Sequence, residues 1–193
     1  MLRRKRIAAI NSQSLRSQTK TFLHRVDPRA NGLYLLPTNR AAAAKAVVFC
    51  ILGKALFVVV LDAFIFRHSL SPDYVTLYTS PLIPRTPVLC ILAAIEEVKY
   101  RLLVMTGLTM LAALWRGKVS GGMFVAIILA SQFYGVWPQV LNDPVYGSLR
   151  YWAVGCLWGY LYWRHGWLAA LIGHATSHLV LDPLLMLALL GIR

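Results

Sequence analysis

Long apolar runs are the feature that most limits how this chain can fold. The first run extends from Ala41 to Phe66, contains Lys54 and Asp62, and is about as long as the hydrocarbon core of a bilayer is thick. Of the 193 residues, 58% are hydrophobic and only 14% are charged, which is far from the composition of a soluble domain. The sequence therefore predicts an integral membrane protein.

Four further apolar segments follow the first, at residues 87–115, 119–137, 148–163 and 167–190. Residues 67–86 contain three prolines and several hydroxyl side chains, which predicts a non-cytoplasmic loop with turns. We expect Pro87 in the first turn of the second helix, Pro138 at the end of the third, and Pro183 to kink or end the fifth. The predicted fold is an all-α, polytopic transmembrane bundle with about five spans, within a range of roughly four to seven.

Positive charge is concentrated near the N-terminus. The net charge is +13, and half of the 20 Lys and Arg residues precede position 46, namely Arg3, Arg4, Lys5, Arg6, Arg16, Lys20, Arg25, Arg29, Arg40 and Lys45. Basic residues ahead of a first span bias that end to the cytoplasm, and they contact anionic lipid head groups. We therefore predict a basic cytoplasmic segment, residues 1–40, and a multi-pass bundle, residues 41–193, in a cell or inner membrane. This distribution argues against a nucleic-acid partner.

The second apolar segment contains a dense group of polar residues, from Glu96 to Arg101, which is the first of two polar islands. Glu96 and Glu97 are the only glutamates of the chain, and an ionised carboxylate inside a membrane helix is costly unless it is paired, hydrated or turned inward. Glu97 and Arg101 are four residues apart, so they can form an ion pair on one helix face, while Glu96 points about 100° away toward Tyr100. One carboxylate can therefore be structural while the other stays free.

The last apolar segment contains the second polar island, from Gly173 to His178. His174 and His178 are four residues apart, which presents both imidazoles on one helix face. If the two islands meet, Glu96 can serve as a general base with the histidines as orienting groups or oxyanion donors. Alternatively, Glu96, His174 and His178 can bind Zn²⁺ or another divalent metal. The same residues also fit a purely structural reading, in which Glu97 and Arg101 clamp helices and the histidines form interhelical hydrogen bonds.

Both islands resemble motifs of one family. Glu96-Glu97-x-x-x-Arg101 resembles the EExxxR motif of the CPBP family, the CAAX-protease and bacteriocin-processing membrane proteins also called Abi proteins. The stretch from Gly155 to Ala175 resembles the family's later block, G-x-x-x-G-x-x-Y-x-R-T-G-S-L-x-x-x-I-x-x-H-A. The order and spacing of the two motifs match as well. The resemblance covers residues 87–182, about half of the chain.

The resemblance implies an intramembrane endopeptidase, either metal-dependent or metal-free, in which the first glutamate activates water. Carried over by position, Glu96 is the base, Glu97 and Arg101 are its supporting pair, and His174 is the third-motif histidine. The chain departs from the family at two positions. The second motif, F-x-x-x-H, falls on Phe133 to Trp137 and so has tryptophan in place of histidine, and the third motif, H-x-x-x-N, has His178 in place of asparagine.

Three functions compete at this level. The first is a peptidase that uses Glu96, His174 and His178 on a membrane-anchored peptide, whether a prenylated C-terminal peptide, a bacteriocin leader or a C-terminal sorting peptide. The second is an inactive relative that binds a membrane partner without cutting it, which Trp137 favours. The third is a small transporter that uses the carboxylates and imidazoles as a proton relay, and the lack of an inverted repeat disfavours it. The sequence does not determine the oligomeric state.

Overall fold

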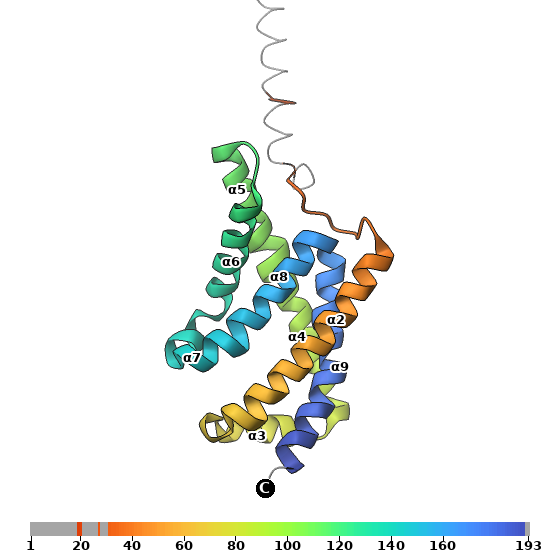
Figure 1. Cartoon of the computed structure of the whole chain (residues 1–193), viewed down its shortest axis with the longest axis vertical. Helices are drawn as coiled ribbons and strands as arrows, with labels where there is room; N and C mark the ends of the chain where they lie inside the picture. Colours follow the sequence, from red (N-terminus) through yellow and green to blue (C-terminus); the bar gives the residue numbers. More distant parts are fainter. Residues whose placement is uncertain (1–18, 21–26, 28–30, 192–193) are drawn as a thin grey trace, which may run out of the picture.

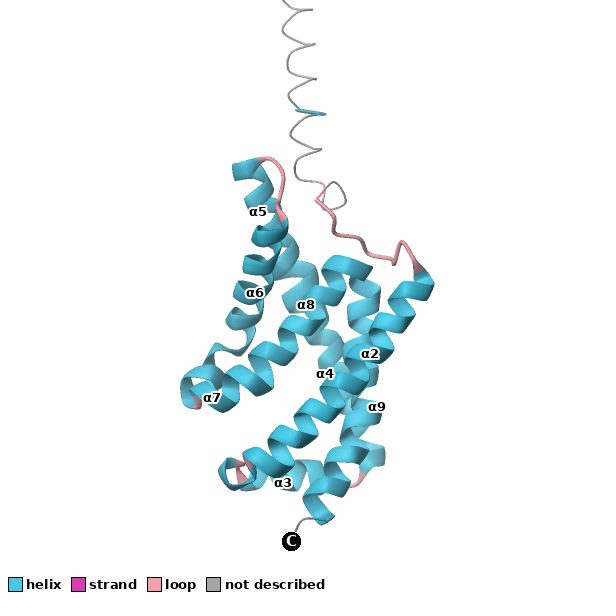
Figure 2. Ribbon diagram, in the orientation of Figure 1, coloured by secondary structure: helices cyan, strands magenta, loops and turns pink. Residues whose placement is uncertain are grey.

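The computed structural model describes residues 19–20, 27 and 31–191, and the described part is almost entirely helical, with no strand (Figure 2). The long helical segments, in chain order, are α2 (Arg40–Val59) with η1 (Val60–Ile65), α4 (Leu82–Glu96) with η3 (Glu97–Met105) and α5 (Thr106–Arg116), α6 (Gly121–Asn142), α7 (Pro144–Gly147) with η4 (Ser148–Ala153) and α8 (Val154–His165), and α9 (Trp167–Gly191). The short elements are η2 (Arg67–Ser69) and α3 (Pro72–Thr79). Most of the basic segment predicted for residues 1–40 lies outside the described residues.

Local sequence signals account for many helix ends. The side chains of Asn39, Ser71 and Ser120 accept hydrogen bonds from the first turns of α2, α3 and α6, as expected of N-cap residues. Gly166 ends α8 with a φ of 89°, which a residue with a side chain rarely adopts. This turn sends the chain directly into α9.

Prolines interrupt the helices less than the sequence predicts. Residues 67–86 are mainly helical rather than a loop, and α4 begins at Leu82, so that Pro87 lies inside it. Likewise, α6 continues through Pro138 and α9 continues through Pro183. Each proline removes one backbone donor, but packing against neighbouring helices keeps the remaining turns intact.

Helix α9 is the centre of the bundle. It packs against α2, α4 and α8, and Figure 1 shows α2 crossing α9 obliquely. Two apolar clusters of buried residues lie along this axis, one around Trp158 and Ala170 and the other around Val58 and Leu185. Buried polar side chains of α9, including His174 and His178, lie between them. The structure therefore has a polar layer near the middle of an apolar bundle.

The outer surface is suited to lipid. Large apolar side chains such as Phe49, Leu56 and Ile83 are exposed, and a surface of this kind is expected where hydrocarbon replaces water. Three helices of the described chain are long and apolar enough to cross a membrane, namely Arg40–Ile65, Gly121–Asn142 and Trp167–Gly191. The predicted all-α membrane bundle is confirmed, and the number of five spans stays a prediction.

Candidate active site

A cavity of about 380 Å³ lies in the polar layer and brings the two sequence islands together. Its wall is formed by side chains from α2, α3, α4, η3, α6, η4, α8 and α9. The polar residues that line it include Lys54, Tyr74, Tyr78, Glu96, Tyr100, Arg101, Gln132, Gln139, Arg150, Tyr151, His174 and His178. The predicted meeting of Glu96 with both histidines is therefore present in the structure.

Glu97 is fully buried and links the two islands. Its Oε1 lies 3.5 Å from Nε of Arg101, so the predicted ion pair is present, and 2.9 Å from Nδ1 of His174. Arg101 also donates a hydrogen bond from Nη2 to the carbonyl oxygen of Gly155 in α8. The carboxylate therefore joins η3 to α9, and its arginine partner joins η3 to α8.

His178 has a carboxylate partner of its own. Its Nδ1 lies 3.0 Å from Oδ1 of Asp182, which is one turn further along α9. Oδ2 of Asp182 accepts a hydrogen bond from the Thr86 hydroxyl at 2.9 Å, and the Arg85 guanidinium lies 3.9 Å from it. The second imidazole is thus anchored to α4 through Asp182.

With Glu97 and Asp182 ionised, one tautomer of both rings fits these contacts. An ionised carboxylate only accepts hydrogen bonds, so Nδ1 of His174 and of His178 would then donate. Nε2 of each neutral ring is then a lone pair, and both rings line the cavity. The two rings are therefore held as acceptors, with centroids 6.2 Å apart.

Glu96 differs from its neighbour in every contact. It lines the cavity, and within the described part of the chain it forms no hydrogen bond and no ion pair. A helical step of about 100° separates its side chain from that of Glu97. The structure thus separates one carboxylate that holds helices together from one that faces the cavity.

Lys54 is a cavity residue to which sequence reasoning assigned no role. It is 4% exposed, and its Nζ donates a hydrogen bond of 2.8 Å to Oγ of Ser177. The same ammonium lies 5.3 Å from the ring centroid of Trp158, on which His174 stacks. These contacts place a cation of α2 beside the histidines of α9.

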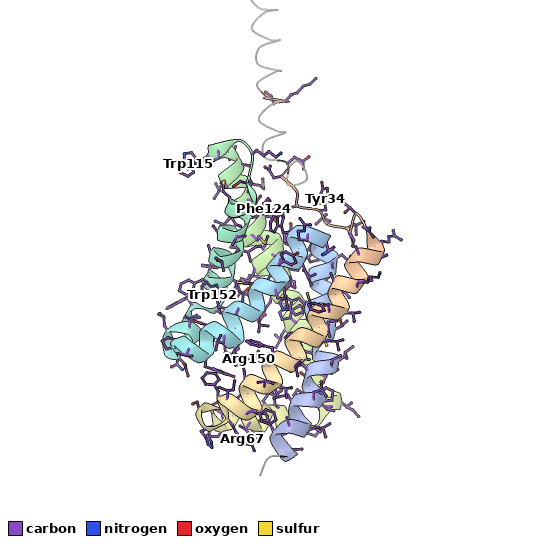
Figure 3. The ribbon with its side chains drawn as sticks, in the orientation of Figure 1. Tyr34, Arg67, Trp115, Phe124, Arg150 and Trp152 are labelled. Carbon is purple, nitrogen blue, oxygen red and sulfur yellow. The ribbon has the colours of Figure 1, made fainter. Side chains whose placement is uncertain are left out.

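A second buried charge network borders the cavity. Asp62 of η1 accepts hydrogen bonds from the hydroxyls of Tyr74 and Tyr146 and forms an ion pair of 2.9 Å with Nε of Arg150. Figure 3 shows Arg150 directed into the space between α2 and the start of α8. This network fastens the end of the first long helix to α3, α7 and η4.

The structure changes the interpretation of Trp137. Its side chain is 50% exposed and does not line the cavity, whereas Gln132, Val136 and Gln139 of the same helix do. The helical period turns position 137 outward when 132, 136 and 139 face inward. Trp137 therefore does not occupy the place of a site histidine, and Gln132 and Gln139 are the polar groups that α6 contributes.

Several other residues of the site escaped sequence reasoning. Asp182 follows His178 by four residues, so its pairing was readable from the helical period. Lys54 and Asp62 were visible as charges in an apolar run, which is itself a sign of function in a membrane helix. Nothing local indicated that Arg150 would reach Asp62, because the two are 88 residues apart.

A metal site was one of the expectations for Glu96, His174 and His178. The three share the cavity, but no group of three His, Cys, Asp or Glu side chains in the described ranges is arranged to hold a metal ion. Because this donor set does not fit a metal as it stands, the role of the three residues as metal ligands stays a prediction.

Fold and site together define an integral membrane protein whose helices enclose a cavity with one free carboxylate and two oriented imidazoles. The chain belongs to the Rce1-like family, described as type II CAAX prenyl endopeptidase Rce1-like, whose model matches residues 78–180. This match confirms the resemblance seen in the sequence and supports a membrane-embedded protease as the general class. A search of curated proteins and a search of solved structures found no match.

Proposed function

We propose that this protein is an intramembrane endopeptidase that hydrolyses a peptide bond of a membrane-associated substrate, with Glu96 as the base. The observation that carries the proposal is the shared cavity of Glu96, His174 and His178, in which Glu96 has no partner among the described residues and both imidazoles are fixed by buried carboxylates. Such a set has the parts that water activation needs: a free base and groups that orient the water.

In the proposed reaction, the Glu96 carboxylate takes a proton from a water molecule whose oxygen attacks the scissile carbonyl carbon. The water donates its other hydrogen to the Nε2 lone pair of one of the two imidazoles, which orients it. When the tetrahedral intermediate collapses, the C–N bond breaks and the proton held by Glu96 passes to the leaving nitrogen. The products are a carboxylic acid and an amine, and no step uses a metal.

A neighbouring apolar hollow favours a prenylated substrate over the other two classes. This hollow of about 220 Å³ lies between α2 and α8 and is lined mainly by apolar side chains, among them Phe49, Phe57 and Leu157. It shares Lys54 and Val154 with the polar cavity. An isoprenoid chain in the hollow would keep the adjoining peptide within reach of Glu96, and a CAAX prenyl substrate agrees with the description of the family.

The test is cleavage of a farnesylated peptide with a C-terminal CAAX sequence by the full chain reconstituted in liposomes, read by mass spectrometry. Glu96→Gln keeps size and hydrogen bonding but removes the base, so we expect kcat to fall by about 10²–10⁴-fold. Asp73→Asn makes the same chemical change at an exposed position of α3, and it should retain the wild-type rate. A peptide without the isoprenoid should be cleaved more slowly, and a metal chelator should not lower the rate.

Comparison of protein termini in cells that express wild type or Glu96→Gln at equal abundance extends the test to unknown substrates. New termini that appear only with wild type would identify the cleavage site. Identical termini, together with equal rates for wild type and Glu96→Gln on the peptide, would contradict the peptidase and favour the inactive, partner-binding relative.

A further inference from the structure

The geometry points to Lys54 as the donor that stabilises the oxyanion formed when water adds to the scissile carbonyl. This inference rests on the proposed peptidase activity and adds a residue of α2, outside both sequence islands. A carbonyl oxygen gains a full negative charge in that step, and one well-placed donor in a site that excludes water is worth about 10²–10³ in kcat.

With ionised carboxylates beside them, the two imidazoles do not supply this donor. Nδ1 of His174 lies 2.9 Å from Oε1 of Glu97 and Nδ1 of His178 lies 3.0 Å from Oδ1 of Asp182, so each neutral ring then offers only an acceptor at Nε2. Acceptors orient the attacking water but repel a developing oxyanion. The cavity therefore needs a hydrogen-bond donor from another residue.

The other buried cations around the cavity are already paired. Arg85 lies within 3.9 Å of Asp182, Arg101 within 3.5 Å of Glu97, and Arg150 within 2.9 Å of Asp62. Lys54 alone among the buried basic residues of the described chain has no carboxylate within ion-pair distance. Its N–H donors are therefore not committed to a carboxylate and can reach an anionic group that enters the cavity.

The contacts of Lys54 hold its ammonium in place but occupy only part of its hydrogen-bonding capacity. An ammonium has three N–H donors, and the one hydrogen bond found for it in the described chain goes to Oγ of Ser177. Ser177 in turn donates to the carbonyl oxygen of His174 at 2.6 Å, which aligns its oxygen lone pairs toward Lys54. Two N–H groups remain beside His174, in a cavity that Glu96 also lines.

In atomic terms, Lys54 acts between attack and collapse. As the water oxygen bonds to the carbonyl carbon, the C=O π electrons move to the oxygen, and Lys54 donates a hydrogen bond to that oxyanion. When the C=O bond re-forms, the C–N bond breaks and the proton moves from Glu96 to the nitrogen. Lys54 keeps its proton throughout, so the hydrolysis stays balanced.

The experiment measures kcat and KM of Lys54→Met on the farnesylated CAAX peptide, with the full chain in liposomes. Methionine has a similar length but no donor and no charge. We expect kcat to fall by about 100-fold or more while KM changes little, because the contact forms only in the transition state. Lys45→Met is the matched control, since Lys45 is on the same helix but exposed and outside the cavity.

A second readout separates oxyanion binding from a merely structural charge. A phosphonate analogue of the peptide carries tetrahedral anionic oxygens at the scissile position, so its affinity for Lys54→Met should fall by about the same factor as kcat/KM. An unchanged phosphonate affinity, or a change in KM alone, would overturn the proposal.

If Lys54→Met does not fold, Ser177→Ala provides the test, because it removes the acceptor that positions the ammonium. We expect a roughly tenfold loss of kcat and of phosphonate affinity, and wild-type values for both would overturn the proposal. A failure of the Lys54 proposal can be distinguished from a failure of the proposed peptidase activity. If Glu96→Gln abolishes cleavage but Lys54→Met does not, only the oxyanion role is wrong, whereas equal rates of wild type and Glu96→Gln contradict the peptidase itself.

Discussion

At the scale of single residues, two adjacent glutamates have opposite tasks. Glu97 is fully buried against Arg101 and His174, whereas Glu96 faces the cavity without a partner in the described chain. The same chemical group is therefore structural at one position and available for chemistry at the next. The difference comes from the 100° step of the helix and from what packs against each face.

This difference predicts separate effects of two identical substitutions. Glu97→Gln leaves the buried Arg101 guanidinium without its carboxylate, and breaking a buried pair in this way costs about 3–5 kcal/mol. Glu96→Gln removes no observed contact and should leave stability unchanged. Thermal unfolding of both variants in detergent measures the contrast.

Measurements of peptidase activity should also distinguish the two variants. Glu96→Gln should be stable but inactive, whereas Glu97→Gln should lose stability and, through misorientation of His174, part of its kcat. Equal thermal midpoints for Glu97→Gln and wild type would show that the Glu97 ion pair does not hold the helices together.

At the scale of elements, glycines of α8 allow α6 to approach closely. A Cβ at Gly155 would overlap the side-chain amide of Gln132, and one at Gly159 would lie 2.8 Å from Cγ2 of Ile128. Two small residues four apart on one helix are a common device for close packing in membranes. The approach also brings the Gly155 carbonyl to Arg101 and Gln132 to the cavity wall.

We therefore expect Gly155→Val to force α6 and α8 apart. Overpacking of this kind costs about 1–3 kcal/mol, and displacement of Gln132 and Arg101 should lower kcat as well. Gly107→Ala in α5 is the control, because a Cβ there meets nothing within 4 Å. That change should be neutral or slightly stabilising, so a similar loss of thermal stability in both variants would contradict close packing at Gly155.

Three short π-helical segments also act at this scale. η1 contains Asp62, η3 contains Glu97 and Arg101, and η4 contains Arg150. The π-helix is rare, and π-helical turns inside α-helices are frequently found at functional sites. In this protein each segment contributes to a buried ion pair.

At the scale of the whole molecule, the Asp62 network closes one end of the bundle. Asp62, Tyr74, Tyr146 and Arg150 come from four different elements and bond to one another. Tyr74 and Arg150 also line the cavity. The network therefore connects the arrangement of α3 to the shape of the site.

Arg150→Met should loosen this connection, because it leaves Asp62 buried without a cation, at a cost of about 3–5 kcal/mol. We expect faster amide hydrogen exchange in α3 and η1 than in wild type, measured by mass spectrometry on the reconstituted protein. Arg116→Met, at the exposed end of α5, should leave exchange in these segments unchanged. Equal exchange in α3 for Arg150→Met and wild type would rule out the fastening role.

The sequence by itself determined the features that depend on nearest neighbours along the chain. Apolar length established the membrane helices, and i,i+4 spacing established the Glu97–Arg101 pair and the shared face of His174 and His178. The helical period alone sets these relations, so they hold wherever the helix lies. The cytoplasmic position of the N-terminus and the five spans remain predictions of the same kind.

Only the tertiary structure decided which helix faces meet. It brought Lys54 to Ser177, 123 residues away, joined Asp62 to Arg150, and turned Trp137 outward while Gln132 and Gln139 face the cavity. These outcomes depend on the rotation of each helix about its axis, which is set by packing against all its neighbours at once. A helix in lipid has little hydrophobic reason to prefer one rotation, so small residues and buried polar contacts decide it.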